Sequence, residues 1–132
     1  DRVPKKLVVW GSGAIGIEFA SFFNTLGSKT TVIEMLSTVM PVEDKEISEI
    51  AKKSFQNQGM EILTSTKLLS ATKIKDGLQL TIEDSTGKKS TIETDVLITA
   101  VGVVPNTENI GIENKSAQII QRQIYFPNEC WI

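Results

Sequence analysis

The sequence predicts an α/β fold with three layers, in which an antiparallel β-meander replaces one crossover helix of a central parallel sheet. Two observations carry this prediction. A buried strand, a glycine-rich turn, a helix and a second strand follow one another within residues 7–34. Between residues 67 and 94, apolar and polar residues alternate in short segments, where a helix would otherwise return the chain to the sheet.

The first βαβ unit is marked by glycines on both sides of its helix. The apolar run Leu7–Trp10 stops at a glycine, as is typical of a strand buried on both faces. A helix is expected next, because apolar residues recur at helical spacing: Ile15, Phe19, Phe22, Phe23 and Leu26. Gly27 supplies its C-terminal stop. The β-branched segment 29–34 is then a second strand, parallel to the first through a right-handed crossover.

A second amphipathic helix is expected after a loop at residues 35–42. Acidic residues gather where a helix N-terminus favours negative charge: Glu43, Asp44 and Glu46. An apolar stripe follows, formed by Ile47, Ile50, Ala51 and Phe55. We expect this helix to cover one face of the sheet, with Gly59 after its end and a third strand at residues 60–63.

The meander is predicted from three alternating segments, 68–74, 78–82 and 90–93. Asp76-Gly77 is a strong hairpin signal, and residues 84–88 form a longer turn. Another buried parallel strand is expected at residues 96–101, ended by Gly102. Near the C-terminus, residues 118–126 fit a strand or an edge ribbon.

The composition limits the possible functions. The 132 residues, 40% hydrophobic and 23% charged, suit a single domain spanning residues 1–132. The net charge of −2 offers no basic surface, so we expect neither nucleic acid nor a membrane as partner. The absence of histidine excludes a histidine base and every histidine-containing metal site, and Cys130 alone forms neither an internal disulfide nor a zinc cage. We therefore expect no metal site and a reducing, intracellular location.

Residues 11–16 (GSGAIG) form a G-x-G-x-x-G motif. Gly11 permits the tight turn out of the strand, Gly13 leaves room for a pyrophosphate, and Gly16 lets the helix pack closely on the strand. The phosphates would meet the free amides at the positive end of the helix dipole. A bare glycine match is a weak signal, but this one lies between a predicted strand and a predicted helix. The sequence therefore predicts a Rossmann-like, dinucleotide-binding domain.

Glu34 ends the predicted second strand, 18 residues after Gly16. Such folds place a carboxylate there to accept hydrogen bonds from the adenosine ribose hydroxyls, although an ordinary solvated charge is the alternative. The next residues, Met35 and Leu36, are not basic, so neither would neutralise the 2′-phosphate that Glu34 would repel. NAD is therefore expected over NADP.

Three further residues are candidates for contacts with the cofactor. Glu18 lies in the first turns of the helix, where it either interacts with the helix dipole or faces the nicotinamide. Gly102 lies at the carboxyl edge of the sheet, where ligands bind in open α/β folds, or is a plain strand-ending turn. Leu68 either lies near the adenine or belongs to the core.

These segments resemble a known family. GSGAIGIEFASFF, VIEM at the next strand end, the hairpin-rich insert and LITAVGVVPNTENIG are similar to the NAD-binding domain of the dihydrolipoamide dehydrogenases. Those enzymes are pyridine nucleotide-disulfide oxidoreductases of class I, and the resemblance runs from about Lys5 to Glu113. It implies that the cofactor-binding residues are Gly11, Ser12, Gly13, Ala14, Ile15, Gly16, Glu18, Glu34, Leu68 and Gly102.

The resemblance also implies a role within a larger flavoprotein. Such enzymes oxidise dihydrolipoamide to lipoamide through a redox disulfide and FAD, with hydride transfer to NAD. The chain's partners would be a FAD domain and an interface domain, in a homodimer within a 2-oxo acid dehydrogenase complex. The location would be the cytoplasm, or the mitochondrial matrix in a eukaryote. Because the resemblance places the redox cysteine pair in the FAD domain and the acid/base pair in the interface domain, we expect the chain alone to bind NAD weakly and to catalyse nothing, and no catalytic residue is assigned to it.

Other functions stay open. The chain could be the equivalent domain of an NADH oxidase or of another disulfide reductase. Many relatives carry arginine where Val103 stands, but valine occurs in some dihydrolipoamide dehydrogenases, so this residue argues mainly against a glutathione reductase. The Ala-x-Gly-Asp flavin segment expected after Glu113 is not found, so the role of residues 114–132 is left open. From a different class, a stand-alone NAD-sensing module would bind NAD tightly and expose an apolar patch that docks a partner.

Overall fold

A computed structural model of the chain describes residues 2–104, 106, 111, 118–120 and 123–125. The chain divides into two units, one ending at Gly102 and the other beginning at Val103. The first unit contains all the elements predicted between residues 6 and 99. No helix in the described part of the chain is long and apolar enough to cross a membrane.

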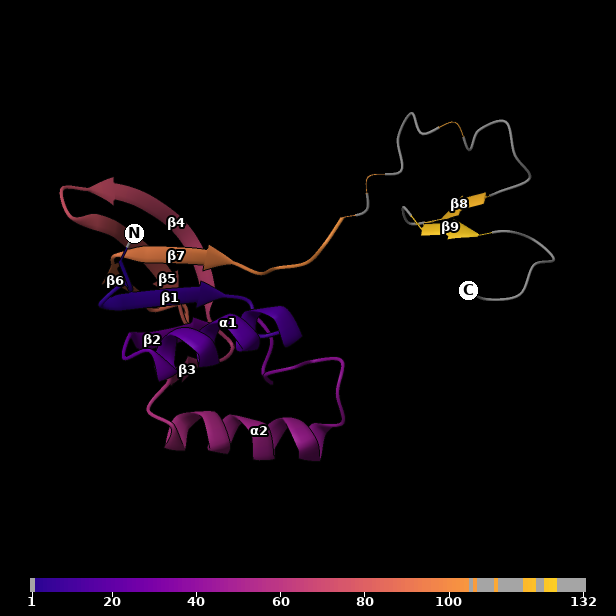
Figure 1. The fold of residues 1–132 in the computed structure, drawn as a ribbon, viewed down its shortest axis with the longest axis horizontal. Helices are drawn as coiled ribbons and strands as arrows, with labels where there is room; N and C mark the ends of the chain where they lie inside the picture. Colours follow the sequence, from indigo (N-terminus) through magenta and orange to yellow (C-terminus); the bar gives the residue numbers. More distant parts are fainter. Residues whose placement is uncertain (1, 105, 107–110, 112–117, 121–122, 126–132) are drawn as a thin grey trace. The chain divides into compact units, whose positions relative to one another are not determined.

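The first unit is built on a parallel sheet of four strands (Figure 1). The strands are β1 (Lys6–Trp10), β2 (Lys29–Ile33), β3 (Glu61–Leu63) and β7 (Val96–Thr99), in the order β3-β2-β1-β7. Helix α1 (Ala14–Thr25) connects β1 to β2, and α2 (Lys45–Asn57) connects β2 to β3. These connections confirm the predicted βαβ unit and the second helix.

The meander is also confirmed. Strands β4 (Lys67–Ile74), β5 (Gly77–Glu83) and β6 (Lys89–Thr94) form an antiparallel sheet in the order β4-β5-β6. They connect β3 to β7, where a doubly wound domain would carry a crossover helix. Gly77 has a φ of 136°, so the predicted hairpin between β4 and β5 uses the conformational freedom of glycine.

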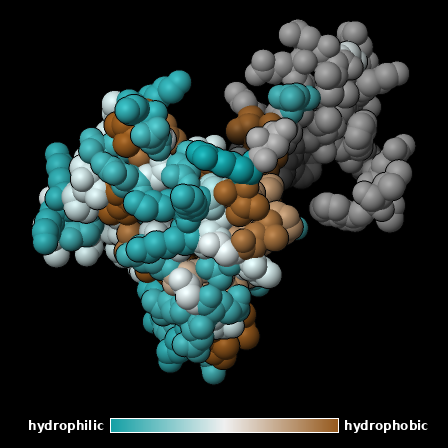
Figure 2. All heavy atoms as spheres, turned by 60° about the vertical axis from the view of Figure 1, so that its left-hand side comes forward, coloured by the Kyte–Doolittle hydropathy of each residue, from teal (hydrophilic) through white to brown (hydrophobic). Residues whose placement is uncertain are grey.

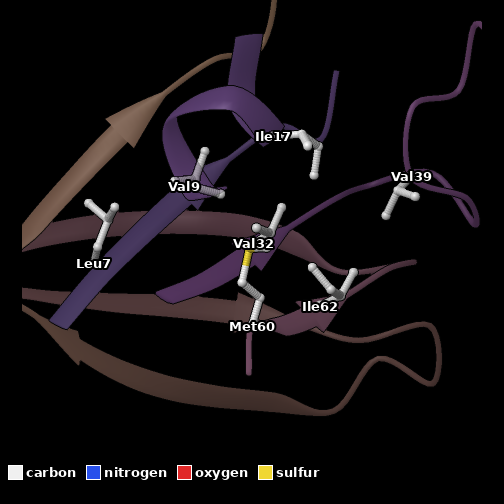
Figure 3. Packing of buried hydrophobic residues seen from close by; sticks show 8 residues of the cluster. Leu7, Val9, Ile17, Val32, Val39, Met60 and Ile62 are labelled. Carbon is white, nitrogen blue, oxygen red and sulfur yellow. The ribbon is translucent and has the colours of Figure 1, made fainter. Parts of the chain in front are cut away.

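Alternate residues of β1 point to opposite faces of the parallel sheet, which creates two hydrophobic clusters. Leu7 and Val9 pack with residues from α1, β2 and β3 on the helix-covered face, as Figure 3 shows. Val8 packs on the other face with Ile33 and with Leu80 of the meander. The layers are therefore helices, parallel sheet and meander, in agreement with the predicted α/β class.

The apolar residues whose spacing predicts α1 mark its buried face only in part, since Phe23 alone among them packs against the core. The buried residues of α1 are Gly16, Ile17 and Ala20. Four of the five residues whose spacing predicts the helix are about half exposed: Ile15 (50%), Phe19 (44%), Phe22 (58%) and Leu26 (49%). Small side chains allow the close approach of a helix to the sheet, so they decide which face is buried. In Figure 2, hydrophobic residues interrupt a largely hydrophilic surface.

Helix α2 begins where its acidic residues predict. Asp44 is its N-cap, and the Asp44 carboxylate accepts a hydrogen bond of 2.9 Å from the backbone amide of Glu46. Ala51 and Phe55 pack against the core, whereas Ile47 and Ile50 are more than half exposed. The predicted helix is confirmed, but only part of its apolar stripe reaches the sheet.

The second unit contains an antiparallel pair, β8 (Gln118–Ile120) and β9 (Gln123–Tyr125). This pair lies within the segment for which a strand or edge ribbon is expected. Residues 121, 122 and 126 of that segment lie outside the described residues, as does Cys130. That residues 1–132 form one domain stays a prediction.

Candidate dinucleotide-binding site

Three strand ends meet at the carboxyl edge of the parallel sheet. The backbone amide of Gly11 donates to the carbonyl of Ile33 at 2.9 Å, and that of Ala100 donates to the carbonyl of Trp10 at 2.8 Å. The glycine turn after β1 is therefore held between the end of β2 and the end of β7. Ligands bind at this edge in open α/β sheets.

The three motif glycines have different surroundings. Gly11 has a φ of 105°, and a Cβ added to it would overlap the carbonyl oxygen of Ala100. A Cβ on Gly16 would overlap the carbonyl oxygen of Gly11. A Cβ on Gly13 would meet nothing within 4 Å. Gly11 and Gly16 thus allow close backbone packing, while Gly13 borders open space, as the motif requires for a pyrophosphate.

The N-terminus of α1 is suited to an anion. Gly13 is the N-cap, and no side chain donates or accepts a capping hydrogen bond there. The first intrahelical bond from this end runs from the Ile17 amide to the Gly13 carbonyl at 3.0 Å. The amides that precede Ile17 in the first turn have no partner within the helix, so they can donate hydrogen bonds to a bound phosphate.

A cavity of about 480 Å³ opens beside this turn. Its volume falls within the range of small-molecule sites. It is lined by the glycine turn, the loop after β2 and the segment after β7: Trp10, Gly11, Ser12, Gly13, Glu34, Met35, Leu36, Pro41, Val42, Ala100, Val101 and Gly102. Five of the residues predicted to bind the cofactor therefore lie together: Gly11, Ser12, Gly13, Glu34 and Gly102.

Glu34 is nearly buried, with 8% of its surface exposed. Its Oε2 atom accepts hydrogen bonds from the Ser12 amide (2.9 Å) and the Ser12 hydroxyl (2.7 Å). Its Oε1 atom accepts one from the Leu36 amide at 2.8 Å. An ionised carboxylate offers about four acceptor positions. Among the described residues, these three donors leave about one position, on Oε1, for an outside donor.

The other predicted residues do not line the cavity. Ala14, Ile15 and Gly16 form the start of α1, and Glu18 is exposed one turn further along that helix. Leu68, on β4, packs against the cluster of Val8, Ile33, Leu80 and Ile82. This is the core position that was the alternative for Leu68, and its contact with an adenine stays a prediction.

The loop after β2 forms part of the cavity, which the G-x-G-x-x-G motif does not predict. The amide of Met40 donates to the carbonyl of Ser12 at 2.9 Å, so this loop folds back onto the glycine turn. Pro41 and Val42 of the same loop line the cavity, and Val42 is 88% exposed. The available sequence signal was an apolar loop directly after the strand-end carboxylate.

The strand order, the glycine turn and the helix beginning at the carboxyl edge define a Rossmann-like α/β domain. The model of one family, described as pyridine nucleotide-disulphide oxidoreductase, matches residues 1–126. The chain belongs to this family of oxidoreductases, which confirms the resemblance seen in the sequence.

Individual relatives agree with this assignment. The chain is 48% identical over 113 residues to a dihydrolipoyl dehydrogenase of Rhizobium etli, a match that covers 86% of this chain and 24% of the relative. The chain thus spans about a quarter of the length of the relative that it matches.

Solved structures give the same fold. The HOCl-induced flavoprotein disulfide reductase RclA of Escherichia coli, in its Cu(II) complex, is 28% identical with a TM-score of 0.78. That match covers 92% of this chain and 27% of the solved one. The water-forming NADH oxidase of Lactobacillus brevis, solved with bound NADH, is 27% identical with a TM-score of 0.73, over 89% of this chain and 24% of the other.

Proposed function

We propose that this chain binds NAD(H) and is the nicotinamide-nucleotide domain of a flavoprotein of the dihydrolipoyl dehydrogenase type. The observation that carries the proposal is the cavity at the carboxyl edge, where the open side of Gly13 and the buried carboxylate of Glu34 lie together. The similarity to a dihydrolipoyl dehydrogenase and to an NADH oxidase solved with NADH supports it.

The residues present fit a dinucleotide. The open space beside Gly13 and the amides at the start of α1 would hold the pyrophosphate. The free acceptor position on Glu34 would take a hydrogen bond from a ribose hydroxyl. Gly102, which lines the cavity from the segment after β7, would lie along the nicotinamide half of the cofactor. Glu18 would contact that half as well. Leu68 would border the adenine.

The site favours NAD over NADP. No lysine or arginine is among the described residues that line the cavity, while Glu34 supplies a carboxylate. A 2′-phosphate on the adenosine ribose would bring about two negative charges to that carboxylate, without a cation to offset the repulsion.

The chain's own residues would bind and orient the cofactor. When bound, NAD supplies a hydride acceptor for a reduced flavin. The FAD, the redox disulfide and the acid/base residues would belong to further domains, in a homodimer associated with a 2-oxo acid dehydrogenase complex of the cytoplasm or mitochondrial matrix. We therefore expect the isolated chain to bind NAD(H) without oxidising dihydrolipoamide.

An NADH oxidase is the second candidate, because the chain resembles the Lactobacillus brevis enzyme almost as closely as it resembles the disulfide reductase. The two differ in chemistry outside the nucleotide site. A Cys-x4-Cys pair in the full-length protein would support disulfide reduction, and a single redox cysteine would support the oxidase.

Glu34→Ala tests the proposed site. Loss of the ribose acceptor should weaken NADH binding to the chain by about 1–3 kcal/mol, measured by isothermal titration calorimetry. Glu49→Ala, on the exposed surface of α2, is the matched control and should leave the affinity unchanged. If Glu34→Ala retains its thermal unfolding transition and binds NADH as well as the wild type does, the ribose assignment is wrong.

The NADH affinity of the wild-type chain distinguishes a domain of a larger flavoprotein from a stand-alone NAD-sensing module. A domain that shares its cofactor with absent partner domains should bind NADH with a dissociation constant weaker than roughly 1 μM, because part of the contact surface is missing. Tighter binding by the isolated chain would contradict the domain proposal and favour a stand-alone NAD-sensing module.

A further inference from the structure

Ser12 has a role that the glycine motif does not assign to it. It occupies the first variable position of the motif, and its surface is fully buried. Any residue at this position would offer its backbone amide to Glu34. The serine adds a second donor, because its hydroxyl lies 2.7 Å from the same Oε2 atom that accepts the amide.

The two bonds from Ser12 and the one from Leu36 fix both ends of the Glu34 carboxylate. A carboxylate held at both oxygens has little freedom to rotate, so its remaining acceptor position has a defined direction. Hydrogen bonds to a charged group are about twice as strong as neutral ones. The hydroxyl of Ser12 therefore restrains the group on which ribose recognition depends.

We propose that Ser12 is a positioning residue whose hydroxyl sets the preference for an unphosphorylated ribose, as in NADH, over a 2′-phosphorylated one, as in NADPH. The inference rests on the proposed function, since it concerns the same cavity. Fixed at both oxygens, Glu34 presents an acceptor to a ribose hydroxyl and cannot turn its charge away from a 2′-phosphate. With the hydroxyl removed, Oε2 keeps only the amide bond, and the carboxylate gains the freedom to turn.

Ser12→Ala tests this role through the two cofactors. We expect NADH binding, measured calorimetrically, to weaken about three- to tenfold, as for the loss of one hydrogen bond to a positioned group. NADPH binding should be unchanged or stronger, so the NADH preference should fall. Ser12→Cys keeps a donor at the same position, although a weaker one on a larger atom, and should lie between serine and alanine. It provides the comparison if the alanine variant unfolds.

A double variant distinguishes a positioning role of Ser12, which acts through Glu34, from a purely structural role. In a Glu34→Ala background, Ser12→Ala should leave the NADH affinity unchanged, because the hydroxyl acts through the carboxylate. An equal loss for NADH and NADPH, an unchanged NADH preference, or a full effect in the Glu34→Ala background would overturn the inference. These results all require a wild-type chain that binds NADH; a wild type that does not would contradict the proposed function itself.

Discussion

Gly13 and Gly16 belong to the same motif but should fail in different ways when replaced. Gly13 has an ordinary φ of −65° and open space around its missing side chain. Gly13→Ala should therefore fold as the wild type does and lose NADH affinity, since the methyl group would occupy the space assigned to the pyrophosphate. Thermal unfolding and calorimetric titration of the same sample measure both properties.

Gly16→Ala is the matched variant. Its methyl group would overlap the Gly11 carbonyl, so the backbone must shift, and we expect about 1–3 kcal/mol less stability. A Gly16→Ala variant as stable as the wild type, or a Gly13→Ala variant with full NADH affinity, would contradict the assigned surroundings of these glycines.

Much of the residue-level site follows from the sequence. The roles of Gly11, Gly13 and Gly16 depend on backbone geometry that the motif spacing encodes. The two bonds from Ser12 to the Glu34 carboxylate do not follow from the motif, because they join residues 22 positions apart whose approach depends on the register of β1 and β2. Leu68 was ambiguous for a related reason: alternation assigns a side chain to one face but does not identify its neighbour.

At the scale of elements, Asp95 connects the meander to the parallel sheet. Its Oδ2 atom accepts hydrogen bonds from the amides of Lys6 (3.1 Å) and Lys5 (2.7 Å), at the start of β1. These bonds, first that from Lys6 and then that from Lys5, lower the pKa of the Asp95 carboxyl. Because the pKa is lower in the folded chain, ionised Asp95 stabilises the fold above the unfolded-state pKa, and this contribution is lost as the pH falls through the folded-state value.

Asp95→Ala should therefore lower the urea midpoint of unfolding at neutral pH. The difference from the wild type should be constant above about pH 5 and should shrink as the pH falls below about 4. Glu49→Ala on α2 serves as a control for the removal of one exposed acidic residue. A difference between wild type and Asp95→Ala that does not change over this range would exclude the ionised carboxylate as its source.

The sequence predicts which segments form helices and strands better than it predicts which face of each helix is buried. The helical spacing of Ile15, Phe19 and Phe22 correctly indicates a helix, yet these residues are about half exposed. Periodicity identifies the kind of element, but the buried face is chosen by which side chains permit close approach to the sheet. In α1 the small residues Gly16 and Ala20 permit this approach, and Ile17 is buried beside them.

For the whole first unit, stability depends on the packing of the meander on the parallel sheet. Leu80 of β5 is completely buried and packs with Val8 and Ile33 of the sheet. Leu80→Ala should cost about 2–5 kcal/mol of unfolding free energy, from lost apolar burial and the cavity left behind. Leu69→Ala, at a 44% exposed position on β4, is the control and should cost much less. Equal losses would mean that the two sheets do not share a core.

The order of the layers was predictable because the glycine motif, the β-branched strand and the hairpin turns each depend on local chemistry. The boundary after Gly102 was not predicted, although the sequence from 102 to 111 (GVVPNTENIG) is rich in glycine, proline and asparagine, because such a composition is also typical of an ordinary surface loop. Contacts between distant segments decide such a division, and one sequence does not reveal them.

The account rests on NAD(H) binding at the carboxyl edge of the parallel sheet. The most direct test is an NMR titration of the ¹⁵N-labelled chain with NADH. The amides of Ser12, Gly13 and Leu36 should shift progressively, while that of Gly87, in the turn after β5, should stay in place. NADPH should shift the same amides less at equal concentration. Cavity amides that do not move with NADH at about 1 mM, or shifts confined to other parts of the chain, would contradict the account.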